Sequence, residues 1–185
     1  MDTSDFRNGI SIVFDNDILT IVDFQHVKPG KGGAFVRSTL RNVRNGKVFD
    51  KTWRAGEKME QAILERRGLQ YLYNDGTDYF LMDPETYDQV GVSKDQIGNG
   101  IKYLRENMEL TVMYHKESII GIEIPSFVEL EVTETAGSEK GDTASGGGKP
   151  ATVETGAVVT VPFFVKVGDK IKIDTRNDQY LERVK

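Results

Sequence analysis

Residues 26–37, "HVKPGKGGAFVR", place one lysine at the centre of a turn rich in glycine and proline. Pro29 fixes its own φ and stiffens the entry to the turn, while the neighbouring glycines let the backbone take positive φ and approach another surface closely. Lys31 is therefore expected at the tip of a narrow projection. Such a cation could neutralise a phosphate or carry a covalent modification. The alternative is an ordinary solvated loop lysine.

Basic residues continue beyond this turn. Residues 26–54 contain one acidic residue, Asp50, and eight basic ones: Lys28, Lys31, Arg37, Arg41, Arg44, Lys47, Lys51 and Arg54. The whole chain has a net charge of −5, so this cluster stands out against its background. It predicts a face that contacts phosphates. The alternative is a solvated hairpin whose lysines protect its edges from strand pairing.

The residues give little support for disulfides, metal sites or catalysis. The chain has no cysteine, which excludes disulfides and thiolate zinc sites, and its two histidines, His26 and His115, are far apart in sequence. The segment around Lys31 is not a P-loop, because G-x-x-x-x-G-K-[ST] is absent, and neither a nucleophile elbow, H-E-x-x-H nor G-x-G-x-x-G occurs. We therefore predict a protein that is not an enzyme and that uses no metal or cofactor.

Short strands must position the lysine turn. Residues 1–64 alternate in β fashion, and Asn45-Gly46 marks a tight turn between two strand patterns. This predicts a small barrel over residues 1–64, with Trp53 as a core aromatic. Residues 57–67, "EKMEQAILERR", carry a helical pattern and are predicted as a short helix or a connector.

Two further β modules follow. Residues 65–126 contain a hairpin turn at Asn74-Asp75-Gly76 and a polar insert with helical potential, and residues 127–185 contain strand patterns on both sides of a long glycine-rich loop. Both patterns are typical of five-stranded oligonucleotide-binding barrels. The predicted fold class is therefore all-β, with three small β-barrels.

The hydropathy of the chain predicts a cytoplasmic protein without a membrane association. Hydrophobic residues make up 38% and charged residues 29%, and no apolar run approaches the length of a membrane span. The N-terminus lacks the basic region and apolar core of a signal peptide.

Three separate stretches resemble one family. They are "DFRNG" with "FQHVKPGKGGAFVR" near the N-terminus, "GDTASGGGKPAT" with the pattern Lys149-x-Ala151-x4-Gly156-x2-Val159-x-Val161-Pro162-x2-Val165-x2-Gly168, and the terminal Tyr180-Leu181-Glu182-Arg183. Together, and in this order, they resemble bacterial translation elongation factor P over essentially all 185 residues.

The resemblance implies a fold and a role. The fold would be an SH3-like (KOW-like) barrel followed by two OB-fold barrels, in an L-shaped, tRNA-like arrangement. The role would be to bind the 70S ribosome, as a monomer, between the peptidyl and exit tRNA sites, and to stimulate peptide bond formation where consecutive prolines stall it. Its partners would be the peptidyl-tRNA, ribosomal RNA, the mRNA at the exit-site codon and a lysine-modifying enzyme.

The resemblance also assigns roles to residues. Lys31 would be lengthened by modification and reach the CCA end of the tRNA; because it is a lysine, the arginine-sugar modification is excluded. A lysyl-type and an aminopentanol-type extension both stay open, and the Pro29-Gly30 setting favours the second. The remaining assignments are the tip loop (Lys28, Pro29, Gly30, Gly32, Gly33), the RNA backbone contacts (Arg37, Arg41, Arg44, Arg54), the exit-site codon loop (Gly141, Asp142, Thr143, Ala144) and the small subunit or anticodon arm (Tyr180, Arg183).

Two other functions stay open at this point. One is a family paralogue with a narrower ribosomal task. The other is a generic single-stranded RNA-binding protein built from OB-folds, which would need aromatic platforms and which the acidic balance of the chain disfavours.

Overall fold

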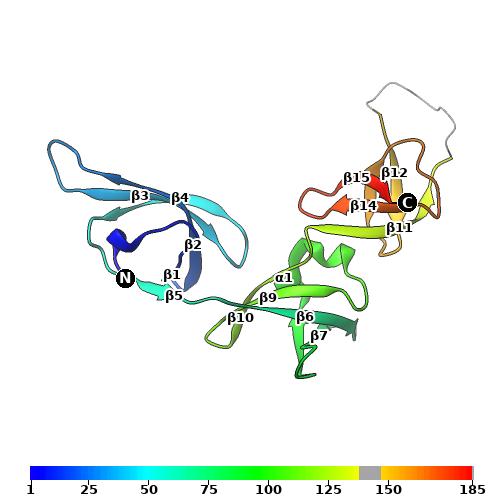
Figure 1. The fold of residues 1–185 in the computed structure, drawn as a ribbon, viewed down its shortest axis with the longest axis horizontal. Helices are drawn as coiled ribbons and strands as arrows, with labels where there is room; N and C mark the ends of the chain where they lie inside the picture. The colour runs from blue at the N-terminus through cyan, green and yellow to red at the C-terminus, as the bar shows by residue number, and fades with distance from the viewer. Residues whose placement is uncertain (138–146, 185) are drawn as a thin grey trace. The chain divides into compact units, whose positions relative to one another are not determined.

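The computed structural model describes residues 1–137 and 147–184, and β-strands dominate this part of the chain (Figure 1). The all-β fold class is confirmed. By its contacts the chain divides into two compact units, Met1–Arg67 with Val112–Ile122 and Gly68–Thr111 with Glu123–Lys185. Among the described residues, no helix is long and apolar enough to cross a membrane.

The N-terminal sheet has five strands in the order β4-β3-β2-β1-β5. A short 3₁₀ helix, η1 (Thr3–Asp5), precedes β1 (Ser11–Phe14), β2 (Asp17–Val27), β3 (Phe35–Asn42), β4 (Val48–Arg54) and β5 (Glu60–Ala62). All neighbouring strands pair antiparallel. The turn predicted at Asn45-Gly46 joins β3 to β4, where Gly46 has a φ of 70° that suits glycine.

Alternation along β3 gives this sheet its core. Val36 and Leu40 are fully buried, whereas Arg37 and Arg41, each the next residue along the strand, are exposed. Trp53 lies in the core as predicted, at 2% exposure, and its indole Nε1 donates a hydrogen bond to Ser38 Oγ at 2.8 Å. Phe6 packs edge-on against the Trp53 ring, with centroids 5.9 Å apart. The inner face of the hairpin is therefore fixed by packing, which leaves its outer face free for binding.

The predicted helix over residues 57–67 is wrong. The segment instead forms β5 and the start of β6 (Glu65–Asn74), and β5 pairs with β1, with Gln61 opposite Ile12. Without β5, strand β1 would have an edge of unpaired backbone N–H and C=O groups. Hydrogen bonds between β1 and β5 therefore stabilise the strand more than the local pattern of residues 57–67 stabilises a helix. Ile63, which a helix would have buried, is 71% exposed.

The second sheet has the order β10-β9-β6-β7-β8. Its further elements are β7 (Asp78–Met82), β8 (Gln89–Ser93), α1 (Lys94–Ile97), η2 (Gly98–Tyr103), β9 (Glu109–His115) and β10 (Ser118–Glu123). The predicted hairpin turn at Asn74-Asp75-Gly76 joins β6 to β7. Helical structure follows Ser93, whose side chain accepts from the Gln96 backbone N–H while the Gln96 side chain accepts in return, a capping box.

The third sheet closes into a barrel in the order β11-β12-β13-β15-β14. Its strands are β11 (Phe127–Thr135), β12 (Lys149–Val153), β13 (Val158–Val161), β14 (Lys170–Asp174) and β15 (Gln179–Val184). Buried Val128, Leu130 and Val132 alternate with exposed glutamates on β11. On the outer surface, Glu129 and Glu131 lie opposite Lys172 and Lys170 of β14, a register in which opposite charges face each other.

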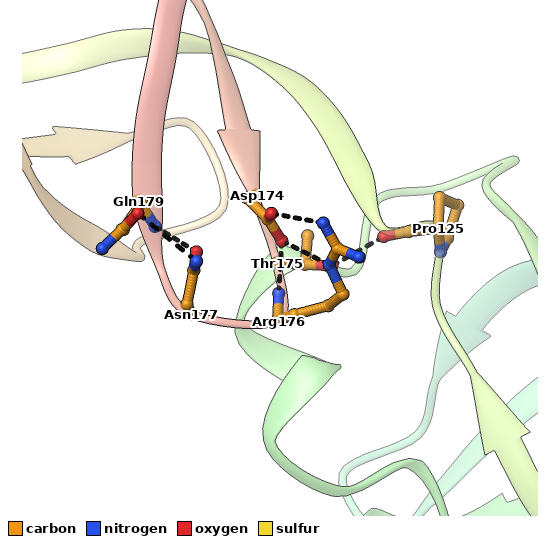
Figure 2. A network of polar contacts seen from close by, with 6 residues as sticks. All are labelled: Pro125, Asp174, Thr175, Arg176, Asn177 and Gln179. Atoms are coloured by element: carbon orange, nitrogen blue, oxygen red, sulfur yellow. Dashed lines mark hydrogen bonds and ion pairs between the residues drawn. The ribbon is translucent and has the colours of Figure 1, made fainter.

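Polar contacts at one end of this barrel attach it to the preceding chain (Figure 2). The Arg176 side chain donates to both carboxylate oxygens of the buried Asp174, at 2.9 and 2.6 Å, and this pairing lowers the pKa of Asp174. The Thr175 hydroxyl donates to the Pro125 carbonyl at 2.7 Å. The β14–β15 loop is therefore tied to the segment that leads out of the second sheet.

Candidate functional site

The Lys31 loop, residues 28–34, is the candidate functional site. It joins β2 to β3 beyond their last cross-strand pair, Val27 with Phe35, and projects from the N-terminal sheet (Figure 1). Lys31 is exposed, and within the described residues its ammonium has no hydrogen-bond or ion-pair partner. The hairpin therefore presents a cation that is free to bind something outside this chain.

The three glycines of the loop differ in backbone conformation. Gly32 has a φ of 110°, so the expected positive φ occurs there, and a Cβ added to it would lie 3.9 Å from Pro29 Cγ. Gly30 and Gly33 do not take positive φ, and an added Cβ would meet nothing within 4 Å at either position. Within this loop the backbone therefore requires glycine at Gly32 alone, and the other two glycines leave space on the outside of the loop.

The predicted phosphate-contacting arginines lie on the outer face of β3 and β4 and in the turn that joins these two strands. Arg37 and Arg41 point outward from β3, Arg54 is exposed on β4, and Arg44 is exposed in the β3–β4 turn. The Arg37 guanidinium carbon lies 5.5 Å from the centroid of the Phe35 ring. In the described part of the chain none of the four side chains forms an ion pair, so their charges are available for external anions.

Lys51 is not part of this face. Its ammonium lies 4.2 Å from the Phe14 ring centroid and 4.6 Å from that of Trp53, two core-packed rings. Cation–π attraction therefore holds it on the opposite side of β4 from Arg54. The count of basic residues along the sequence accordingly overstates the charge of the outer face.

A shallow polar hollow of about 420 Å³ lies across β2, β3 and β4. Six of its lining residues form two cross-strand rows, Asp23, Thr39 and Asp50 in one, and Gln25, Arg37 and Thr52 in the other, and Phe24, Ser38 and Lys51 complete the lining. The Thr39 hydroxyl donates to Asp50 Oδ1 at 2.7 Å. The outer face thus combines cations with acceptors rather than being uniformly basic.

The sequence analysis missed Asp23 and Gln25 as part of this face. Asp23 precedes the basic cluster, and only the pairing of β2 with β3 sets it beside Thr39. Alternation would have placed Asp23 and Gln25 on the inner face, because they share the parity of the buried Leu19 and Ile21. What could not be read from sequence was the bulge between Ile21 and Asp23, which sets the register.

The C-terminal candidates belong to the third barrel. Tyr180 is half-buried against the barrel core, and this burial raises the pKa of its hydroxyl. Arg183 forms an ion pair with Asp169 at 3.5 Å and lies 5.7 Å from the Phe164 ring centroid. The exit-site codon loop assigned by resemblance, Gly141, Asp142, Thr143 and Ala144, lies outside the described residues.

The two histidines lie within the first compact unit but in different packing environments. The His26 ring packs edge-on against Phe24, with centroids 5.6 Å apart, and His115 Nδ1 lies 3.3 Å from the Ile63 carbonyl oxygen. Within the described residues, no group of three or more histidine and acidic side chains is placed to hold a metal ion.

Comparison with known proteins decides the family. Three family models match in succession: the KOW-like domain of elongation factor P at residues 2–59, its OB domain at 64–122 and its C-terminal domain at 128–183. The chain belongs to the elongation factor P family. It is 58% identical to elongation factor P of Pelotomaculum thermopropionicum and 56% identical to that of Carboxydothermus hydrogenoformans, each over 182 residues and 98% of both chains.

Solved structures extend the likeness beyond elongation factor P itself. Eukaryotic translation initiation factor 5A from Methanococcus jannaschii matches with a TM-score of 0.51 and 25% identity, covering 68% of this chain and 92% of that one. A translation initiation factor 5A family protein from Naegleria fowleri shares the fold, with a TM-score of 0.53 and 17% identity over 67% of this chain and 96% of that one. The family models and the curated elongation factor P relatives identify this chain as a translation elongation factor, in agreement with the resemblance seen in its sequence.

Proposed function

We propose that this protein binds the ribosome between the peptidyl and exit tRNA sites and stimulates peptide bond formation where consecutive prolines stall it. One observation carries the proposal: a member of the elongation factor P family presents a lysine at the tip of a projecting hairpin, with no partner for that lysine among the described residues. Because the loop needs glycine for its own fold only at Gly32, Gly30 and Gly33 would allow close approach to RNA.

The stimulation proposed here is positional. Proline is a poor acceptor and a rigid donor, because its ring fixes φ and crowds the approach to the carbonyl carbon. The protein would supply no reacting group. Lys31, lengthened by modification, would hold the CCA end of the peptidyl-tRNA, so that the ribosome's own chemistry starts from a productive geometry.

The remaining contacts follow the same proposal. Exposed arginines of the hairpin, Arg37, Arg41, Arg44 and Arg54, would neutralise RNA phosphates. The loop Gly141–Ala144 would face the exit-site codon, and Tyr180 with Arg183 would contact the small subunit or the anticodon arm. The protein would work as a cytoplasmic monomer with three domains, 1–64, 65–126 and 127–185, and a lysine-modifying enzyme would act on Lys31.

The test is a reconstituted translation assay on a message that encodes three consecutive prolines, using protein purified from its native cells. Wild type should relieve the stall and Lys31→Ala should not. Lys47→Ala is the matched control, since Lys47 is an exposed lysine of the β3–β4 turn, at the opposite end of β3 from the Lys31 loop. Intact-mass analysis of both variants would show whether added mass depends on Lys31.

The other outcomes are equally informative. Equal relief by wild type and Lys31→Ala would overturn the role of the tip. Relief by neither, with the expected added mass present on wild type, would favour a family paralogue with a narrower ribosomal task.

A further inference from the structure

The turn between β13 and β14 exposes large apolar side chains on the third barrel. Phe163, Phe164 and Val167 are 39%, 55% and 59% exposed, although the core of the barrel is closed beneath them. The exposed part of these three neighbouring side chains costs hydration free energy, and an apolar cluster of this kind often marks a binding site. We call residues 162–169 the phenylalanine turn.

The phenylalanine turn is held in a fixed conformation. Val165, at its centre, is fully buried in the barrel core, and its N–H donates to the Pro162 carbonyl at 3.1 Å. The Asp169 carboxylate accepts from the Lys166 N–H at 2.9 Å, and the Gly168 N–H donates to the Val132 carbonyl at 2.8 Å. The exposed rings therefore sit on a preorganised base, which reduces the entropy that binding would cost.

The turn carries one exposed cation that can meet an external anion. The Lys166 ammonium has no partner among the described residues, whereas Lys172 forms an ion pair with Glu182 at 3.4 Å and Lys170 lies opposite Glu131. The guanidinium of Arg183 lies beside the Phe164 ring, and its ion pair with Asp169 fixes it there. An exposed flat ring with cations around it fits a base and its phosphate better than it fits an acceptor-poor apolar peptide.

We propose that the phenylalanine turn is a stacking site for an unpaired RNA base, with Phe164 as the platform and with Lys166 and Arg183 beside the adjoining phosphates. The proposal deepens the proposed function, because it names the chemistry that the third barrel would recognise on the ribosome. A purely electrostatic contact would bind any phosphate chain with similar affinity, whereas a stacking site should bind more tightly when bases are present.

The test uses free protein and two fluorescein-labelled probes, a ten-nucleotide oligoadenylate and a ten-residue abasic ribose-phosphate chain, with binding followed by fluorescence anisotropy at low salt. Wild type should bind the oligoadenylate more tightly, by about fivefold or more, because base–aromatic stacking supplies an effect of that size. Phe164→Ala should remove this difference and leave binding of the abasic chain unchanged. Phe164→Leu should do the same, since leucine keeps apolar area but has no flat ring.

A matched control lies on the same barrel. Phe127 is 48% exposed and has cations near its ring, Lys172 at 5.7 Å and Arg176 at 5.2 Å from the centroid, as Phe164 has Arg183, but it lies outside the phenylalanine turn. Phe127→Ala should leave the preference for oligoadenylate intact because the proposed site does not include Phe127, and thermal unfolding of each variant should match wild type.

Several results would overturn the proposal. They are the absence of wild-type binding, equal wild-type affinity for both probes, a preference that survives Phe164→Ala, or a loss that Phe127→Ala shares. A preference that survives Phe164→Leu would also overturn it, because the flat ring would then not be what holds the base. This assay measures RNA binding and forms no peptide bond. A negative result therefore counts against the stacking site and leaves the proposed stall relief to be judged by the translation assay.

Discussion

Two lysines of the N-terminal sheet show how the local environment decides the role of a residue. Lys51 lies against the rings of Phe14 and Trp53, where it stabilises the hairpin. Lys31 extends from the loop and has no partner in the part of the chain that the structure describes. Lysine thus contributes to the fold at Lys51 and is available to an external ligand at Lys31.

Glycine substitutions can separate the fold from the binding role of the tip. Gly30→Ala and Gly33→Ala should change the free energy of unfolding by less than about 0.5 kcal/mol, because nothing lies within 4 Å of the added methyl group. Gly32→Ala should cost about 1 kcal/mol, because of its φ of 110°. Denaturant unfolding measures these values.

The same variants then enter the translation assay. We expect Gly30→Ala and Gly33→Ala to weaken stall relief without loss of stability, since a methyl group would obstruct close approach to RNA. A loss of stability at Gly30 or Gly33 would contradict the conformation described for the loop.

At the scale of elements, pairing outweighs local pattern. Residues 57–67 have a helical pattern, yet β5 completes the edge of β1 and leaves Ile63 exposed. The cost of unpaired backbone groups on β1 exceeds the small preference of a short isolated segment for helix.

Substitution of Ile63 distinguishes the two structures of this segment. Ile63→Ser should change the free energy of unfolding by less than about 0.5 kcal/mol, because the side chain is 71% exposed. The control, Ile12→Ala, should cost about 2–5 kcal/mol, because Ile12 is fully buried opposite β5. A cost of several kcal/mol for Ile63→Ser, measured by denaturant unfolding, would restore the helix.

At the scale of the whole molecule, η2 packs against the third barrel within the second compact unit. Tyr103 of η2 is fully buried in the core of the third barrel, and its hydroxyl donates to Asp178 at 2.7 Å. Burial and this bond raise the pKa of Tyr103. Lys102 also donates to Asp178, at 2.6 Å, so η2 contributes both apolar and polar contacts to the barrel.

This junction should be sensitive to acid. The hydrogen bonds from Lys102 and Tyr103 lower the pKa of Asp178 below its usual value near 3.8, so its stabilising effect is complete above that value and is lost as pH falls through the lowered pKa. Asp178→Asn should therefore reduce Tm at neutral pH and flatten the fall of Tm below about pH 4. Asparagine tolerates the φ of 60° at this position.

Differential scanning calorimetry between pH 2 and pH 7 measures this effect. Tyr103→Phe is the matched control, because it removes one hydrogen bond to Asp178 but keeps the carboxylate, and so it should retain a fall of Tm with acid. An Asp178→Asn variant with the same acid dependence as wild type would rule out Asp178 as the sensitive group.

The sequence by itself determined the all-β class, the lysine turn with its basic hairpin, the turns at Asn45-Gly46 and Asn74-Asp75-Gly76, and the family. These features are local: strand alternation, glycine and proline conformations, and motif spacing depend on residues close together in the chain. Arg37, Arg41, Arg44 and Arg54 stood out as a basic cluster and through the family resemblance, and the structure leaves all four exposed.

Only the tertiary structure decided the rest. Pairing with β1 made residues 60–62 a strand, the bulge in β2 brought Asp23 into the arginine face, and the core rings Phe14 and Trp53 drew Lys51 away from it. The burial of Val165 turned Phe163 and Phe164 outward. Each of these outcomes depends on which distant residues share a face or an edge, and contacts between residues far apart in the chain leave no periodic signal in the sequence.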